Sequence, residues 1–89
     1  MKPSKELEEL KKIVLAWRDS YGDVAREIGG GDFLWKDFLE EIEEYAVPYI
    51  AGLRRVGAID EEQRSDFDRF CRGQVELLSK KVQEEEIHG

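Results

Sequence analysis

The chain has 89 residues, of which 40% are hydrophobic and 39% are charged, and its formal net charge at pH 7 is −7. This length fits one domain over residues 1–89, and the apolar fraction is too high for a disordered chain. No uncharged run approaches the length of a membrane span, and the N-terminal residues lack the apolar segment of a signal peptide. The single cysteine, Cys71, cannot form an intramolecular disulfide, which is typical of a reducing compartment. We therefore expect a cytoplasmic domain that does not enter a membrane.

The acidic charge also bears on the choice of partner. With 21 acidic against 14 basic side chains, the surface repels a nucleic-acid backbone. The basic clusters at 54–55 and 64–72 lack the density and the interleaved stacking aromatics of a nucleic-acid footprint, so we do not expect nucleic-acid binding. The absence of Asn and Thr, with abundant Glu, Lys and Arg, resembles the composition of thermophile proteins.

The first expected helix spans residues from about 4 to 28. Its apolar residues recur at alternating intervals of three and four, which places them on one stripe of an α-helix. Gly22 lies among residues that favour turns, but the stripe keeps its phase across it, so we expect one unbroken helix. The glycines at 29–31 favour a left-handed C-cap followed by a flexible connection. The stripe comprises Leu7, Leu10, Val14, Trp17, Tyr21, Val24 and Ile28.

The second expected helix spans residues 33–56. Asp32 can accept hydrogen bonds from its first free backbone amides, and Gly57 is expected to end it. Pro48 lacks an amide proton and its ring crowds the carbonyl of Glu44, so we expect this helix to be kinked or broken at Pro48. Its apolar stripe comprises Trp35, Phe38, Ile42, Tyr45, Tyr49, Leu53 and Val56, widened by Leu34, Leu39, Ala46 and Ile50.

The third expected helix spans residues 61–84. Asp60, followed three residues later by Gln63, predicts a variant capping box, and Ser65 with Asp68 is a competing start. Residues 85–89 are too polar to stay packed and are expected to fray. One face of this helix carries Phe67, Phe70, Cys71, Val75, Leu78 and Val82.

These elements predict an all-α fold, a small up-down-up bundle of three helices. Helices of about 24 residues are roughly 36 Å long, and connections of a few residues force neighbours to run antiparallel. We expect no strand, because β-branched residues never cluster with two-residue alternation.

Carboxylates gather at 40–44 and at 60–68, and hard divalent cations bind several carboxylate oxygens. The run EEIEE at 40–44 contains an EExxE pattern, and Glu62 lies four residues before Asp66. This part of the chain resembles the all-α nucleotide pyrophosphohydrolases of the MazG type, in which EExxE is followed by ExxD, with a spacing of three. The resemblance implies a hydrolase of nucleoside triphosphates that depends on magnesium or manganese, with the ligands Glu40, Glu41, Glu44 and Asp66.

Helical geometry opposes such a metal site. At 100° per residue, Glu40, Glu43 and Glu44 point away from the apolar stripe, and only Glu41 flanks it. A metal site inside a bundle needs carboxylates that face inward. We therefore interpret these residues as a solvated acidic face and expect neither a metal nor another cofactor.

The sequence also lacks the residue patterns that nucleophilic catalysis and phosphate binding need. The only histidine, His88, is the penultimate residue, and Cys71 falls on an apolar helix face, where it is expected to be a buried, unreactive side chain. The glycines at 29–31 follow a helix and are not followed by the Lys and Ser/Thr of a phosphate loop. We therefore do not expect an enzyme.

The preferred hypothesis is a non-enzymatic helical interaction module, a small subunit or adaptor that self-associates or binds a protein partner. A domain of this size buries only about 60–65% of its unfolded surface, so three wide stripes leave apolar area uncovered. Ile13 and Ala25 flank the first stripe, which suits a helix touched by two or more neighbours. We expect a homo-oligomer or a complex with another protein, through an interface of Leu10, Val14, Trp17, Tyr21 and Val24.

Overall fold

The computed structural model describes residues 4–88, and this part of the chain is all-α, with no strand. The all-α class predicted from the periodicity is thus confirmed. No helix within these residues is long and apolar enough to cross a membrane. The elements in chain order are α1 (Lys5–Ile28), α2 (Phe33–Glu41), the π-helical segment η1 (Ile42–Ala46), α3 (Val47–Arg55) and α4 (Glu61–His88).

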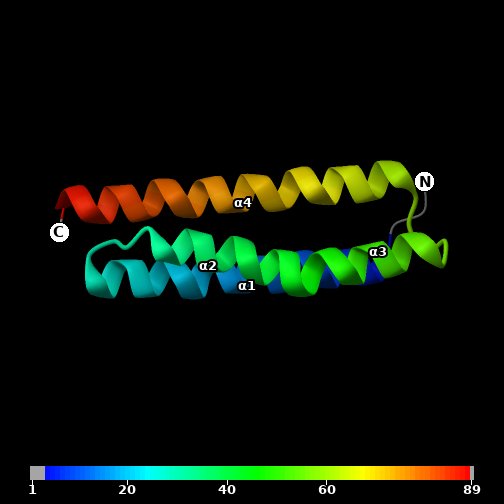
Figure 1. The fold of residues 1–89 in the computed structure, drawn as a ribbon, viewed down its shortest axis with the longest axis horizontal. Helices are drawn as coiled ribbons and strands as arrows, with labels where there is room; N and C mark the ends of the chain where they lie inside the picture. Colours follow the sequence, from blue (N-terminus) through cyan, green and yellow to red (C-terminus); the bar gives the residue numbers. More distant parts are fainter. Residues whose placement is uncertain (1–3, 89) are drawn as a thin grey trace.

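The helices form rods that lie side by side along a body of 47 × 21 × 16 Å (Figure 1). α2, η1 and α3 follow one another as a single rod, which runs opposite to α1, and α4 reverses direction again and covers both (Figure 1). The core contains buried side chains from all of these rods and from the last connection. Its members are Leu7, Leu10, Val14, Ala25, Leu34, Phe38, Ile42, Ala46, Ile50, Ile59, Phe67, Cys71, Leu78 and Val82.

Both ends of α1 are capped, and the cap at its C-terminal end is the glycine cap that the sequence predicts. The Ser4 hydroxyl accepts a hydrogen bond from the amide of Leu7 at 3.1 Å, which satisfies one of the free donors of the first turn. Gly29 ends the helix with φ 77°, and the Gly30 amide donates to the Ala25 carbonyl at 2.8 Å in a Schellman cap. The helix continues without a break through Gly22, as predicted.

The buried face of α1 differs from the predicted stripe at its C-terminal end. Ala25 is fully buried, whereas Val24 and Ile28 are 39% and 55% exposed. A straight α-helix drifts by about 20° per heptad relative to a repeat of 3.5 residues. Over the three heptads of α1 this drift moves the core face from Val24 to Ala25, so the prediction that Val24 and Ile28 belong to the packed stripe is wrong.

The start of α2 also departs from the prediction. Asp32 makes no capping hydrogen bond, because its own backbone is helical, with φ −56° and ψ −29°. A capping side chain needs an extended backbone to reach the amides ahead of it. The Leu34 amide instead donates to the carbonyl of Gly31 at 3.0 Å, so the preceding glycine takes over part of the cap.

The disturbance predicted at Pro48 takes the form of the π-helical segment η1. The amide of Val47 donates to the carbonyl of Ile42, five residues earlier, and Pro48 follows directly in the first turn of α3. A π turn is a known response to an interrupted α-helical ladder, and it widens the helix where the proline ring would crowd a carbonyl. The backbone stays helical through η1, so the helix does not break.

Replacing Pro48 with Ala should therefore cost little stability. The change restores a backbone donor and removes the ring, so η1 can relax toward a regular α-helix. We expect urea denaturation to give a free energy of unfolding within about 1 kcal/mol of the parent. A loss above about 3 kcal/mol would mean that the π turn itself shapes the core around Ile42 and Ala46.

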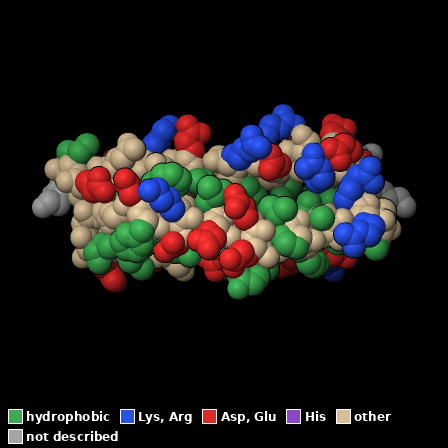
Figure 2. Space-filling model, in the orientation of Figure 1, with side chains coloured by type: hydrophobic (Ala, Val, Ile, Leu, Met, Phe, Trp, Pro, Cys, Tyr) green, Lys and Arg blue, Asp and Glu red, His purple; other side chains and the backbone are tan. Residues whose placement is uncertain are grey.

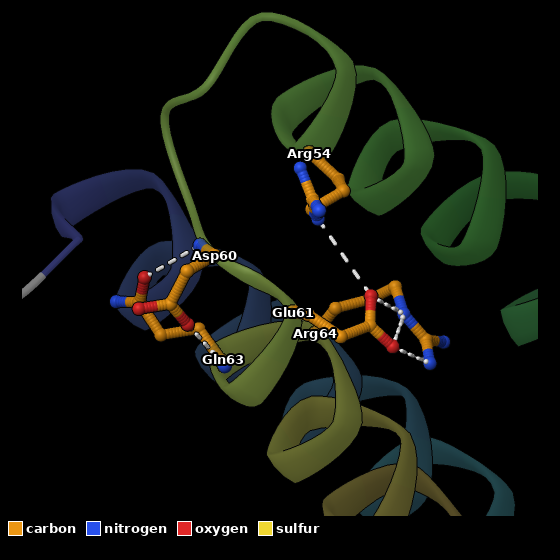
Figure 3. Close-up of polar contacts among 5 residues, drawn as sticks. All are labelled: Arg54, Asp60, Glu61, Gln63 and Arg64. Atoms are coloured by element: carbon orange, nitrogen blue, oxygen red, sulfur yellow. Dashed lines mark hydrogen bonds and ion pairs between the residues drawn. The ribbon is translucent and has the colours of Figure 1, made fainter.

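α4 begins with the capping box that Asp60 and Gln63 predict (Figure 3). The Gln63 amide donates to the Asp60 carboxylate at 2.8 Å, and the Asp60 amide donates to the Gln63 side-chain oxygen at 2.9 Å. Beside it, Glu61 accepts from Arg64 at 2.6 Å and pairs with Arg54 of α3 at 3.6 Å, which links the two helix ends (Figure 3). The hydrogen bond from Arg64 holds the pKa of Glu61 below its usual value.

Asp60→Ala should lower the free energy of unfolding by about 1 kcal/mol, because it leaves the amide of Gln63 without its acceptor. Asp60→Asn keeps a side-chain acceptor in the same place and is the matched control. Urea denaturation of both variants measures the difference. Equal losses in the two variants would show that the carboxylate charge matters and the capping hydrogen bond does not.

The body of α4 agrees with the predicted face, and its end does not. Phe67, Cys71, Leu78 and Val82 are buried, but the helix continues to His88, four residues beyond the expected end at 84. Lys81 pairs with Glu85 at 3.8 Å, and the Glu86 carboxylate accepts from the Gly31 amide at 3.3 Å. These contacts keep residues 85–88 helical where fraying was expected, and residue 89 lies outside the described part of the chain.

Candidate functional site

An open apolar surface lies between the N-terminal half of α1 and the η1–α3 part of the second rod. It is a groove of about 570 Å³ lined by Lys5, Glu6, Glu9, Leu10, Ile13, Trp17, Tyr45 and Tyr49, and we call it the groove. α1 contributes Leu10, Ile13 and Trp17 at intervals of three and four, which brings them to one side of the helix. The rings of Trp17 and Tyr45 lie 6.4 Å apart at 58° and meet across the two rods.

Several groove side chains are largely exposed. Ile13 is 46% exposed, Tyr45 62% and Tyr49 48%. Such residues side by side form a continuous apolar surface, which differs from the isolated apolar residues that every protein surface carries. This surface is the clearest candidate for contact with another molecule.

The exposure of Tyr45 and Tyr49 corrects the predicted stripe of the second helix. The buried residues there are Leu34, Phe38, Ile42, Ala46 and Ile50, each four residues after the last. A spacing of four exceeds the 3.6 residues of an α-turn, and the wide π turn of η1 brings Ala46 and Ile50 back to the core. The two tyrosines are thereby turned outward, and Val56 is 76% exposed.

An acidic hollow adjoins the groove at Tyr45. It measures about 240 Å³ and is lined by Tyr21, Asp37, Glu40, Glu41, Glu44 and Tyr45. The Tyr21 hydroxyl donates to the Glu41 carboxylate at 2.9 Å and ties α1 to α2. Burial and this hydrogen bond raise the pKa of Tyr21 to about 12, so the phenol stays a donor at neutral pH.

The predicted interface residues of α1 fall in three different environments. Leu10 and Val14 are buried in the core of the chain itself, with Leu10 also reaching the floor of the groove. Trp17 and Tyr21 are partly buried and line the groove and the acidic hollow. Val24 is exposed outside both. Ile13, which the sequence places only beside the stripe, is an exposed member of the apolar surface that lines the groove.

The structure brings together only some of the residues that the hydrolase resemblance implies as metal ligands. Glu40, Glu41 and Glu44 line the acidic hollow, but Asp66 lies on α4 and pairs with Arg69 one turn later. Among the side chains that the structure describes, no three His, Cys, Asp or Glu residues converge in a way that could hold a metal ion. Glu41 instead accepts the hydrogen bond from Tyr21.

Cys71 lies in the core, as predicted, with 6% of its surface exposed. Burial raises the pKa of its thiol to about 12, so the thiolate that reacts with electrophiles is scarce. We expect an aromatic disulfide reagent to modify Cys71 at least about a hundredfold more slowly in the native protein than in denaturant. Equal rates in the two conditions would place Cys71 at the surface and contradict the packing of α4.

Comparison with protein-family models, with curated proteins and with solved structures gives no match to this chain.

Proposed function

We propose that this chain is a non-enzymatic helical interaction module, a small subunit or adaptor that binds an α-helix of a protein partner, or of a second copy, in the groove. The observation that carries the proposal is the exposed apolar surface of Ile13, Trp17, Tyr45 and Tyr49 between two rods. An amphipathic helix binds proteins by placing its apolar face in such a groove. Aromatic residues at the centre of an interface contribute most of the binding energy.

The shape of the groove suits a helix. Its α1 wall extends from Lys5 to Trp17, which is about 18 Å at 1.5 Å per residue and matches some three turns of a partner helix. Trp17 and Tyr45 present rigid rings with polar tips, which contact an apolar face while their polar atoms stay near water.

The test combines a measurement of the oligomeric state with the binding of an uncharged helical peptide. We expect either sedimentation velocity to show a dimer that Ile13→Lys dissociates, or an amphipathic Leu/Gln peptide of about 18 residues to bind in the groove. NMR distinguishes the site, because the indole N–H of Trp17 reports on the groove, whereas Trp35 does not line it. A monomer at all concentrations, with no shift of the Trp17 signal, would sink the proposal.

The alternative, a metal-dependent hydrolase of nucleoside triphosphates, stays a prediction. One measurement distinguishes it from the proposed interaction module. An ion held by Glu40, Glu41, Glu44 and Asp66 only in the folded state must raise the melting temperature by mass action. Thermal melting with and without millimolar magnesium or manganese therefore decides, and an unchanged melting temperature contradicts the hydrolase.

A further inference from the structure

We infer that the partner of the groove is a basic amphipathic helix of another protein, one whose apolar face is bordered by Lys and Arg, and that a second copy of this chain is not the partner. This inference rests on the proposed function and adds the charge of the partner. Its basis is the distribution of carboxylates around the groove, which is independent of the apolar surface itself.

The groove and the acidic hollow form one continuous surface. They share Tyr45, and Trp17 and Tyr21 lie one turn apart on α1, with Trp17 in the groove and Tyr21 in the hollow. Together the two are lined by six carboxylates and one ammonium group. The carboxylates belong to Glu6, Glu9, Asp37, Glu40, Glu41 and Glu44, and the ammonium group to Lys5.

Most of this negative charge is not neutralised within the described chain. Glu9 pairs with Lys12 at 3.5 Å, but Asp37, Glu40 and Glu44 form no ion pair with any described basic residue. Acidic side chains gather over the middle of the α2–η1–α3 rod (Figure 2). A partner helix in the groove would extend along these carboxylates, and Lys or Arg at the borders of its apolar face would pair with them.

The same charges disfavour a second copy. A two-fold contact through the groove would bring the same carboxylates of two chains together, and each chain carries a net charge of −7. The basic residues Arg54, Arg64, Arg69 and Arg72 pair with the carboxylates of Glu61, Asp66 and Asp68. These arginines lie on α3 and on the first half of α4, and their ion pairs within the chain compete with any contact to the groove of another copy.

The experiment compares three helical peptides of about 18 residues with one apolar face of Leu and a polar face of Lys, Gln or Glu. We expect the Leu/Lys peptide to bind at least about tenfold more tightly than Leu/Gln, with an affinity that falls as salt is raised, and Leu/Glu to bind most weakly. Each titration is followed by the indole N–H NMR signals of Trp17 and Trp35 and by tryptophan fluorescence.

Matched variants separate the groove from general attraction to an acidic protein. Ile13→Lys should weaken Leu/Lys binding about tenfold, whereas Ile28→Lys, the same change at an exposed position of α1 outside the groove, should weaken it by less than about threefold. Glu40→Gln with Glu44→Gln should weaken binding and reduce its salt dependence. The double variant Glu62→Gln, Glu76→Gln is the control, since it removes the same charge from exposed positions of α4. It should change neither the affinity for Leu/Lys nor the salt dependence of that affinity.

The outcomes also separate this inference from the proposed function. If Leu/Glu binds the groove as tightly as Leu/Lys, or if the chain forms a dimer that Ile13→Lys dissociates, the basic partner is wrong while the helix-binding groove stands. If the two Glu→Gln double variants lose the same affinity for Leu/Lys, the attraction is unspecific and the inference is overturned. If no peptide shifts the Trp17 signal and the chain stays monomeric, the inference and the proposed function both fail.

Discussion

Val14→Glu is expected to unfold the chain. Val14 is fully buried in the core, between α1 and the rods that cover it. A carboxylate at this position would lose its hydration without gaining a partner, at a cost of several kcal/mol. Domains of this kind are stable by about 5–15 kcal/mol, and the smallest lie at the lower end, so the substitution removes most or all of the stability. Far-UV circular dichroism and a urea titration measure the loss of helix directly.

Val24→Glu is the matched control for this prediction. It makes the same change on the same helix, at a side chain that is 39% exposed. Its cost should stay below about 1 kcal/mol, as for other surface substitutions. Val14 contributes to the core of the chain itself, so its loss should unfold the monomer, whether or not the protein self-associates. A folded Val14→Glu variant with native stability would contradict the position of α1 in the core.

The local chemistry of the helix ends could be predicted from the sequence because it depends on residues only a few positions apart. The Asp60–Gln63 capping box, the glycine caps at Gly29 and Gly57, and the disturbance before Pro48 all involve contacts within one or two turns. Each of these interactions selects one backbone geometry without help from the rest of the fold. Asp32 is the exception, since the glycines before it let the chain enter the helix without an extended capping residue.

The faces of the helices were harder to predict, and the reason is geometric. On α1 the apolar stripe follows a repeat of 3.5 residues, while the helix itself turns every 3.6, so the choice between Val24 and Ala25 depends on how straight the helix is. On the second rod, the residues at intervals of four did contain a signal. Leu34, Phe38, Ile42, Ala46 and Ile50 fit a rod with a wide turn better than a regular α-helix.

The groove depends on the separation of two rods, which no local pattern encodes. Tyr45 and Tyr49 fit an apolar stripe by spacing, and only the π turn, which rotates them outward, separates them from the core. Ile13 was recognised as a flanking residue because it widened the stripe of α1. A stripe wider than one neighbour can cover is therefore the sequence feature that points to the groove, and Leu10 and Trp17 are the residues shared by the predicted interface and the observed groove.

Phe38→Ala is expected to cause the largest loss of stability among substitutions that introduce no charge. Phe38 is among the largest fully buried side chains and packs against the ring of Tyr21, with ring centroids 5.8 Å apart. Removing a buried phenyl ring loses its transfer free energy and leaves a cavity, at a combined cost of about 3–5 kcal/mol.

Phe33→Ala, in the same helix, removes the same ring from a side chain that is 53% exposed, and should cost less than about 1.5 kcal/mol. Urea denaturation with a common m-value compares the two variants. Similar losses from both would mean that α2 does not pack on α1 through Phe38, and would remove the support of the rod that carries Tyr45 and Tyr49 to the groove.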